Sequence, residues 1–425
     1  MKSRTKFLAC IFAITRICGF GVASGAEMLR LKVSAPKTDC VDVPLRAIIE
    51  LPESLAGIPA DDITATVEQT RAGPTMVYGL WRPAQLVMIG PKTGQLWWIA
   101  PRMRAGKASQ WRATLRRKDK ARWQALSWQD NKGEYLDLLF DGRKVTRYMY
   151  AYDTSNAQRS FETYKPFLHV FDAQGENLLT NGPDGMHPYL KDKILYPHHR
   201  GIFIGWSKLG FGGRTYGFWG TEGVAQRHVK FLELTAGPVL ARSKALIHWN
   251  DKNGEPIIAE ERQTTVFRQS DPTILLLDFR TELKAVRGEV LLNGDPEHAG
   301  FQYRAHNDVA AGGKEVKATY LFHEEDINPR EDKDLPWAAM SYGLNARRYS
   351  VLHTNHPDNP KGTVYSAYRD YGRFGAFFKE TINSGETLTL RYQIWVAEGQ
   401  MPERQMCAGK YSAFVDCPTV EVVGR

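Results

Sequence analysis

Residues 388–396 read Leu-Thr-Leu-Arg-Tyr-Gln-Ile-Trp-Val, with Leu388, Leu390, Tyr392, Ile394 and Val396 on one face. Side chains of a β-strand point alternately to opposite faces, so this period of two over nine residues predicts a strand. Similar but shorter runs recur along the chain, and the sequence contains no long amphipathic helix. The pattern therefore predicts an all-β protein.

The spacing of strand-like runs and turns predicts two β-domains, as the length of 425 residues also suggests. Over residues 27–125, short runs such as Gln95–Ala100 alternate with Gly/Pro turns, which predicts a small N-terminal β-sandwich. Over residues 126–400 the strands are longer and the aromatic residues denser, which predicts a large sandwich of antiparallel sheets. Residues 401–425 form a C-terminal tail.

Residues 1–26 have the layout of a secretory signal peptide. A short apolar run from Phe7 follows several basic residues, and Ser24-Gly25-Ala26 supplies small residues before a cut at Glu27. This apolar run is too short to span a bilayer. We therefore expect a periplasmic or secreted protein that does not insert into a membrane.

The basic balance of the chain does not indicate a nucleic-acid partner. The formal net charge is +9, and many basic residues lie within 112–122. Such a patch could contact an anion, but export argues against nucleic acid. We expect a solvated hairpin edge, where charges also discourage aggregation.

Three cysteines follow the signal peptide, namely Cys40, Cys407 and Cys417. An oxidising compartment allows one pair to form a disulfide. Cys407 and Cys417 would close a short loop near the C-terminus and are the expected pair. A bridge from Cys40 to either of them, tying the two ends of the chain together, is the alternative.

The densest group of chemically active residues is Tyr196-Pro197-His198-His199-Arg200-Gly201. Trp206 and Trp219 follow next to glycines, and His228 lies nine residues after Trp219. Aromatic rings held on turns can stack on the apolar face of a sugar. Adjacent residues on a strand face opposite ways, so the two histidines share a pocket only if this segment is a loop. The alternative is a surface turn with incidental histidines.

Three further segments contain candidate site residues. Arg304 and His306 share one face of a predicted strand, which combines an anion clamp with a titratable group, unless they form a salt-bridged outer face. His356 and Asn359 lie in a proline-rich turn that is either a binding loop or purely structural. Glu260, or its neighbour Glu261, would be a general acid or base if buried, and otherwise a salt-bridge partner.

The sequence contains no diagnostic metal-binding motif. Four histidines from distant segments could still converge, so a divalent metal ion stays open while no other cofactor is predicted. These histidines are His198, His228, His306 and His356.

The order of several motifs resembles a bacterial family labelled PmoA-like. The label refers to a subunit of a membrane-bound methane oxygenase, a bundle of membrane helices that this sequence cannot form. The resemblance covers about residues 145–400. Its motifs are Lys165-Pro166-Phe167, Asn181-Gly182-Pro183, Pro197 to Trp206, Phe218-Trp219, His356 to Pro360 and Gly385 to Tyr392.

The resemblance implies an antiparallel β-supersandwich similar to that of galactose mutarotase, in which His, Arg and Glu side chains on a concave sheet handle sugars. By this analogy we expect a carbohydrate-active enzyme, a glycoside hydrolase or a lyase, with His199, His228, Glu260 and His306 as catalytic residues. The expected substrate-binding residues are His198, Arg200, Trp206, Trp219, Arg304, His356 and Asn359.

Two considerations refine this expectation. A glycoside hydrolase normally uses two carboxylates, whereas the sequence offers one convincing acidic position, which favours a histidine-based lyase or epimerase. A non-catalytic carbohydrate-binding protein is the alternative. The oligomeric state is not predicted.

Overall fold

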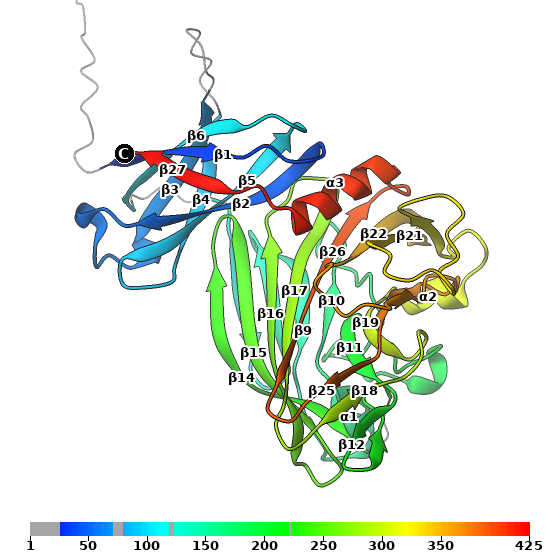
Figure 1. The fold of residues 1–425 in the computed structure, drawn as a ribbon. Coiled ribbons are helices and arrows are strands. Elements are labelled where there is room, and N and C mark those ends of the chain that lie inside the picture. Colours follow the sequence, from blue (N-terminus) through cyan, green and yellow to red (C-terminus); the bar gives the residue numbers. More distant parts are fainter. Residues whose placement is uncertain (1–25, 71–79, 119–122, 221–222) are drawn as a thin grey trace, which may run out of the picture.

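The computed structural model describes residues 26–70, 80–118, 123–220 and 223–425. These residues form antiparallel sheets with a few short helices, which confirms the all-β prediction (Figure 1). Most of the predicted signal peptide and residues 119–122 of the basic segment lie outside the described residues.

The N-terminal part forms one curled sheet of seven strands, called sheet 1, rather than two facing sheets. Its edge strands approach each other, so the sheet encloses its own core around residues such as Trp98 and Trp111. The strand order is β2 (Cys40–Glu50), β5 (Thr93–Met103), β4 (Arg82–Met88), β3 (Ile63–Thr70), β6 (Ser109–Arg117), β1 (Glu27–Val33) and β27 (Val420–Gly424).

The C-terminal residues complete sheet 1. β27 pairs antiparallel with β1, and the Ser34 amide donates to the Thr419 carbonyl at 2.9 Å. Before it, α3 (Arg404–Val415) contacts β2 and β21 and so lies between sheet 1 and the larger domain (Figure 1). The expected tail is therefore a structural connection between the two ends of the chain.

The expected disulfide is absent, because Cys40, Cys407 and Cys417 are all free. Cys407 lies inside α3, and the helix continues to Val415 before the chain reaches Cys417. Eight helical residues span about 12 Å, whereas disulfide-linked Cα atoms lie within about 7 Å. The Cys40 thiol instead donates to the Gly409 carbonyl at 3.3 Å.

The larger domain consists of two eight-stranded antiparallel sheets with a shared core. Sheet 2 has the order β23 (Val364–Tyr365), β24 (Arg373–Phe377), β19 (Ala299–Arg304), β11 (Ile202–Trp206), β10 (Phe167–Val170), β9 (Arg143–Met149), β8 (Tyr135–Phe140) and β7 (Leu126–Asn131). Sheet 3 has the order β14 (Ala225–Ala236), β15 (Leu240–Asn250), β16 (Pro256–Phe267), β17 (Thr273–Ala285), β26 (Thr387–Glu398), β22 (Arg347–Asn355), β21 (Trp337–Leu344) and β20 (Thr319–Phe322).

Smaller elements flank these sheets. Two short helices, α1 (Ala157–Thr163) and α2 (Asn307–Ala311), follow β9 and β19. A four-stranded sheet has the order β13 (Arg214–Tyr216), β12 (Leu209–Phe211), β18 (Val290–Leu292) and β25 (Glu380–Ile382). The single-turn 3-10 helices are Glu53–Leu55, Ala60–Asp62 and Lys191–Lys193.

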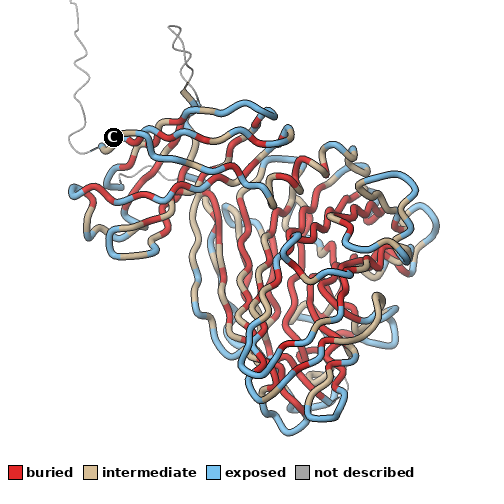
Figure 2. The backbone as a smooth tube through the Cα atoms, viewed as in Figure 1, coloured by how far each residue is buried: buried red, intermediate tan, exposed pale blue. Residues whose placement is uncertain are grey.

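The alternating segment 388–396 forms most of β26, in the middle of sheet 3. Its Tyr392, Ile394 and Val396 join the core shared with sheet 2, where the rings of Tyr392 and Phe301 stack with centroids 4.6 Å apart. Figure 2 shows buried residues concentrated along the strands of the larger domain. This two-sheet packing is the large antiparallel sandwich that the sequence predicts.

The shared core also contains a buried ion pair. The Glu260 carboxylate accepts hydrogen bonds from Arg262 Nε at 2.7 Å, from Trp249 Nε1 at 2.7 Å and from Thr281 Oγ1 at 2.8 Å. Glu260 is fully buried between the sheets. Its carboxylate is therefore engaged by donors of sheet 3.

We predict that Glu260→Ala lowers the free energy of unfolding by about 3–5 kcal/mol, because it leaves the buried Arg262 without its counter-charge. Glu261→Ala is the matched control: Glu261 is 41% exposed and pairs with Lys244, so its loss costs less than about 1 kcal/mol. Urea unfolding of both variants measures the difference. Equal losses would contradict the structural role of Glu260.

Candidate functional site

The candidate site lies on the face of sheet 2 that points away from the shared core. On β19, Phe301 and Tyr303 belong to the core, so Gln302 and Arg304 point to the opposite face. On β24, Arg373 lies directly opposite Arg304 in the antiparallel register. This outer face therefore carries buried polar and charged side chains.

The chain between β10 and β11 folds over this face. The Pro183 carbonyl accepts a hydrogen bond from His169 Nε2 at 2.9 Å, and the Asp184 carbonyl accepts one from Arg147 Nη1 at 2.7 Å. Both donors lie on the outer face of sheet 2. The covering segment thereby removes this face from water.

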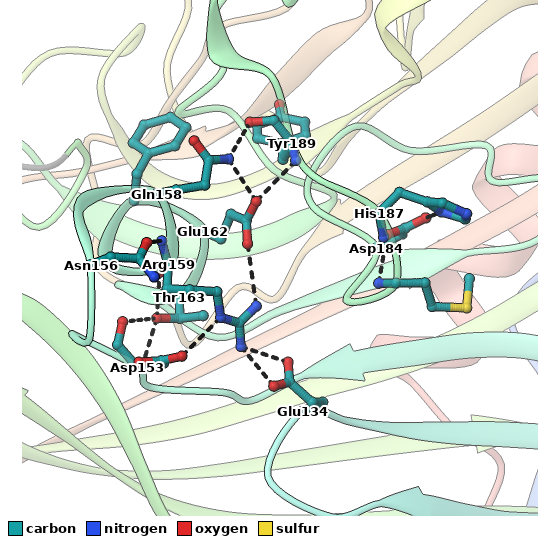
Figure 3. Close-up of polar contacts among 12 residues, drawn as sticks. Glu134, Asp153, Asn156, Gln158, Arg159, Glu162, Thr163, Asp184, His187 and Tyr189 are labelled. Carbon is teal, nitrogen blue, oxygen red and sulfur yellow. Dashed lines mark hydrogen bonds and ion pairs between the residues drawn. The ribbon is translucent and has the colours of Figure 1, made fainter.

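Ion pairs around α1 hold a second part of the cover (Figure 3). Arg159 contacts the carboxylates of Glu134, Asp153 and Glu162 at 2.7, 2.9 and 3.2 Å. Glu162 also accepts a hydrogen bond from the Tyr189 amide at 2.9 Å, which ties α1 to the segment before β11. The Arg159 guanidinium thus has carboxylate partners. The arginines of the neighbouring site, described below, do not.

Arg200 and Gly201 position the turn that enters β11. The Arg200 guanidinium donates to the Phe161 and Glu162 carbonyls of α1. Gly201 has φ of +38°, and a Cβ there would lie 2.1 Å from the Leu168 carbonyl oxygen. Only glycine fits this approach, so the turn has a defined path that places His199 against the sheet.

His199 lies among aromatic rings in the centre of the site. Its ring is stacked at 15° to that of Tyr371 with centroids 6.1 Å apart, and it meets the Trp219 ring edge-on at 5.4 Å. His198 contacts it at 4.3 Å. His199 is 2% exposed, and neither ring nitrogen has a hydrogen-bond partner in the described part of the chain. A buried imidazole normally uses at least one nitrogen.

Lys165 joins the two loops that carry these rings. Its Nζ donates to the His198 carbonyl at 3.0 Å and to the Trp219 carbonyl at 2.8 Å. It also lies 3.8 Å from the centroid of the Phe203 ring, on β11. The buried amine therefore fixes His198 and Trp219 relative to sheet 2.

Arg304 and Arg373 complete the site. Arg304 donates to the carbonyls of Tyr371 and Leu195. Arg373 donates to Gln302 Oε1 at 2.9 Å and to the Tyr371 hydroxyl at 2.9 Å. Arg304 Nε and Arg373 Nη2 remain without partners among the described residues.

Burial and like charge lower the pKa values of the two histidines and the lysine of the site. Burial, followed by the charge of Arg373, holds the pKa of His199 well below its usual value. The pKa of His198 is lowered to about 3, first by burial and then by Lys165. Burial also lowers the pKa of Lys165 well below that of a free amine. His199 is therefore neutral at pH 7, with one nitrogen able to accept a proton.

The structure brings several of the expected residues together. One cluster contains four of them, namely His198, His199, Trp219 and Arg304. Arg200 fixes the turn that carries the two histidines by its hydrogen bonds to α1. Trp206 is fully buried in the core between the sheets, where its Nε1 donates to the Phe378 carbonyl, so its ring is not available to a sugar.

Two of the expected catalytic residues lie elsewhere. Glu260 is in the core described above. His228, on β14, packs on the rings of Tyr148, Tyr150 and Phe231, with centroids 4.5–5.8 Å away. It contacts aromatic residues at the edge of the sandwich.

The other three expected residues have structural contacts. His306 caps α2, with its Nδ1 accepting from the Asp308 amide at 3.3 Å. Its pKa is lowered first by burial and to a lesser extent by Arg304. His356 meets the Phe414 ring of α3 edge-on at 5.4 Å. Asn359 donates to Asn355 Oδ1 at 2.7 Å within its turn. His356 and Asn359 thus lie near α3 and away from His199.

Sequence reasoning missed three residues of the site, Lys165, Tyr371 and Arg373. Lys165 occurs in one of the motifs quoted above, but the spacing of that motif does not indicate a chemical role for the lysine. Arg373 begins the run Arg-Phe-Gly-Ala-Phe, all five of whose residues are buried. A basic residue inside an apolar strand run was the signal that could have identified it.

Among the described residues, no group of three or more His, Cys, Asp or Glu side chains is arranged to hold a metal ion. No helix in the described part of the chain has the length and apolar character needed to cross a bilayer.

Residues 135–410 match a family of unknown function, DUF6807. The chain belongs to this family. The DUF6807 region runs from the start of β8 into α3 and contains every residue of the cluster. The region of the PmoA-like resemblance, about 145–400, lies inside it, although that label is not part of the match.

Comparison with other proteins adds little to the DUF6807 assignment. No curated protein matches the sequence significantly. The structure is similar to that of a GalM/aldose epimerase homologue from C. elegans, with 9% sequence identity, a TM-score of 0.29, and coverage of 65% of this chain and 99% of that chain. This score is too low to support a functional conclusion.

The buried histidines predict that the protein loses stability in acid. A histidine whose folded pKa is lowered takes up its proton only on unfolding, so stability is retained above about pH 6.5 and lost as the pH falls below it. Each such histidine contributes a slope of up to about 1.4 kcal/mol per pH unit. We expect His199→Gln to flatten the dependence between pH 6.5 and 4.5 by about that amount.

Urea unfolding at several pH values measures this slope. His187→Gln is the matched control, because the His187 side chain is 77% exposed and bonded to Asp184. An unchanged slope in His199→Gln would show that His199 is protonated in the folded protein.

Proposed function

We propose that the protein is a carbohydrate-active enzyme in which His199 transfers a proton to or from a bound sugar. The observation that carries this proposal is the neutral His199 ring, buried but without a hydrogen bond at either nitrogen. Leaving such a ring unpaired is unfavourable unless a ligand completes its contacts. The neutral ring has a lone pair free to accept a proton, and the negative charge of a bound ligand would raise the pKa of His199 toward the working pH, where a general base is most effective.

The surroundings of His199 support a carbohydrate as the substrate. Tyr196, which is 47% exposed, stacks on His199 with ring centroids 5.5 Å apart. Tyr371 lies 4.7 Å from Tyr196. Aromatic rings at the rim and polar donors at the base are the combination that binds a sugar through its apolar face and its hydroxyls.

The charge of the site favours elimination over hydrolysis. Hydrolysis of a glycoside normally uses two carboxylates close to the scissile bond. The groups that act most strongly on His199 are instead Arg373, His198, Arg304 and Lys165, each of which lowers its pKa. We therefore propose a lyase. The signal-peptide features of residues 1–26 support action in the periplasm or outside the cell.

Product analysis tests the proposal. Residues 27–425 are incubated with a panel of polysaccharides and glycosides, with and without a chelator, and the products are weighed by mass spectrometry. We predict unsaturated products without added water, and a loss of at least about 100-fold in rate for His199→Ala, since general base catalysis contributes that much. His356→Ala, on the α3 side of the molecule, is the control and keeps the wild-type rate.

Other outcomes would contradict parts of the proposal. Products heavier by one water per cleavage would establish hydrolysis instead of elimination. Full activity of His199→Ala would remove His199 from the mechanism. Retention on a polysaccharide without any turnover would identify a non-catalytic carbohydrate-binding protein.

A further inference from the structure

We infer that Arg304 and Arg373 form a binding site for the carboxylate of a uronic acid in the substrate. The inference rests on the proposed function, because it names the substrate class of the same site. It concerns the two guanidinium groups that face outward from β19 and β24.

The first observation is the pairing of two like charges. Arg304 and Arg373 are direct cross-strand partners in the antiparallel register, and both are fully buried. Like charges at such positions destabilise a sheet, and burial removes the water that would screen them. Neither guanidinium forms an ion pair with any described carboxylate. Within the described part of the chain, neither arginine therefore has a carboxylate at ion-pair distance.

The second observation is a set of unused donors. Arg304 Nε and Arg373 Nη2 are buried without hydrogen-bond partners in the described residues, and so is Trp219 Nε1 beside His199. Unpaired buried donors are costly, and charged ones most of all. A carboxylate has two oxygens and accepts from two guanidinium groups at once. A carboxylate placed between Arg304 Nε and Arg373 Nη2 would supply an acceptor for each.

The third observation is that nearby acidic side chains already have other partners. Glu297 pairs with Arg369 at 2.9 Å, and Glu162 pairs with Arg159 at 3.2 Å. Lys165 is buried as well and offers no negative charge. Among the described residues no carboxylate therefore balances the two guanidinium groups, and the carboxylate of a ligand would do so.

The chemistry of elimination favours a carboxylate over a sulfate or phosphate ester. Binding of the carboxylate by two arginines stabilises the negative charge that forms when the adjacent carbon loses its proton. His199 takes this proton, and the electron pair of the C–H bond forms a double bond to the next carbon. The C–O bond to the leaving sugar breaks at the same time.

The step needs neither water nor an oxidant. The leaving oxygen receives a proton from the Tyr371 hydroxyl, which accepts a hydrogen bond from Arg373 Nε at 2.9 Å. His199 then returns its proton through solvent to Tyr371. The products are an unsaturated uronic acid and a sugar with a free hydroxyl.

Calorimetry of the mature chain tests the inference. The probes are galacturonate, glucuronate and mannuronate, their neutral hexoses, the galacturonate methyl ester and a sulfated galactose, all at one ionic strength. We expect at least one uronate to bind at least about tenfold more tightly than its hexose or ester. In Arg373→Gln the affinity for that uronate falls by roughly thirtyfold and the preference is lost, as for a buried charge pair that loses one partner.

Arg347→Gln is the matched control, because Arg347 is exposed, pairs with Glu398 at 2.9 Å and lies on β22, outside the site. It keeps the preference. Arg373→Gln without ligand melts at a higher temperature than the wild type, because the repulsion with Arg304 is gone. If that variant does not fold, added salt gives the second test: it weakens uronate binding by the wild type and leaves hexose binding unchanged.

The outcomes separate the two proposals. Equal binding of uronates and hexoses, or binding of only the sulfated sugar, overturns the uronate site, and His199-dependent turnover of a neutral glycan would then leave the proposed function intact. Uronate-selective binding that is lost in Arg373→Gln supports the carboxylate site. If no substrate is turned over as well, the proposed enzymatic function is rejected.

Discussion

The arrangement of the larger domain depends on positive charge that is buried on the outer face of sheet 2. Arg304 and Arg373 lie opposite each other on neighbouring strands, with Lys165 and two histidines nearby. The two guanidinium charges repel each other once water is excluded. They remain in place because the backbone register of β19 and β24 is set by the apolar residues on the opposite face, Phe301, Tyr303 and Phe374. The core thus imposes the close approach of the charges.

The segments that cover this face of sheet 2 also hold the site residues in place. The Arg159 network fixes α1, the Arg200 guanidinium fixes the turn before β11 to α1, and Lys165 fixes that turn to the loop of Trp219. The Arg159 and Lys165 contacts are made to carboxylates and carbonyls, whereas Arg200 keeps an unpaired Nε. Of the thirteen buried side-chain atoms without partners among the described residues, six gather at His199, Arg200, Trp219, Arg304 and Arg373, and the other seven belong to seven residues elsewhere. The unsatisfied polar groups therefore define the site more sharply than any sequence motif does.

The sequence predicts the sheets better than the site, for a physical reason. Alternation reports which face of a strand is apolar, so the segment that became β26 could be identified directly. The same rule could have excluded Trp206: it continues the series Ile202, Ile204 on β11 and belongs with them in the core. Its neighbouring glycine suggested an exposed turn instead. Convergence of Lys165, His199 and Arg373 depends on strand order, which no local pattern records.

Two of the buried arginine arrangements in the larger domain differ in whether a carboxylate of the protein pairs with the guanidinium group. Arg262 lies beside Glu260, whose carboxylate also satisfies Trp249 and Thr281, so this pair is complete within the protein. Arg304 and Arg373 face each other with no carboxylate between them. A fold that neutralises one buried guanidinium so fully has the means to neutralise the others. The contrast between the paired Arg262 and the unpaired Arg304 and Arg373 is therefore the observation on which the proposed uronate site rests.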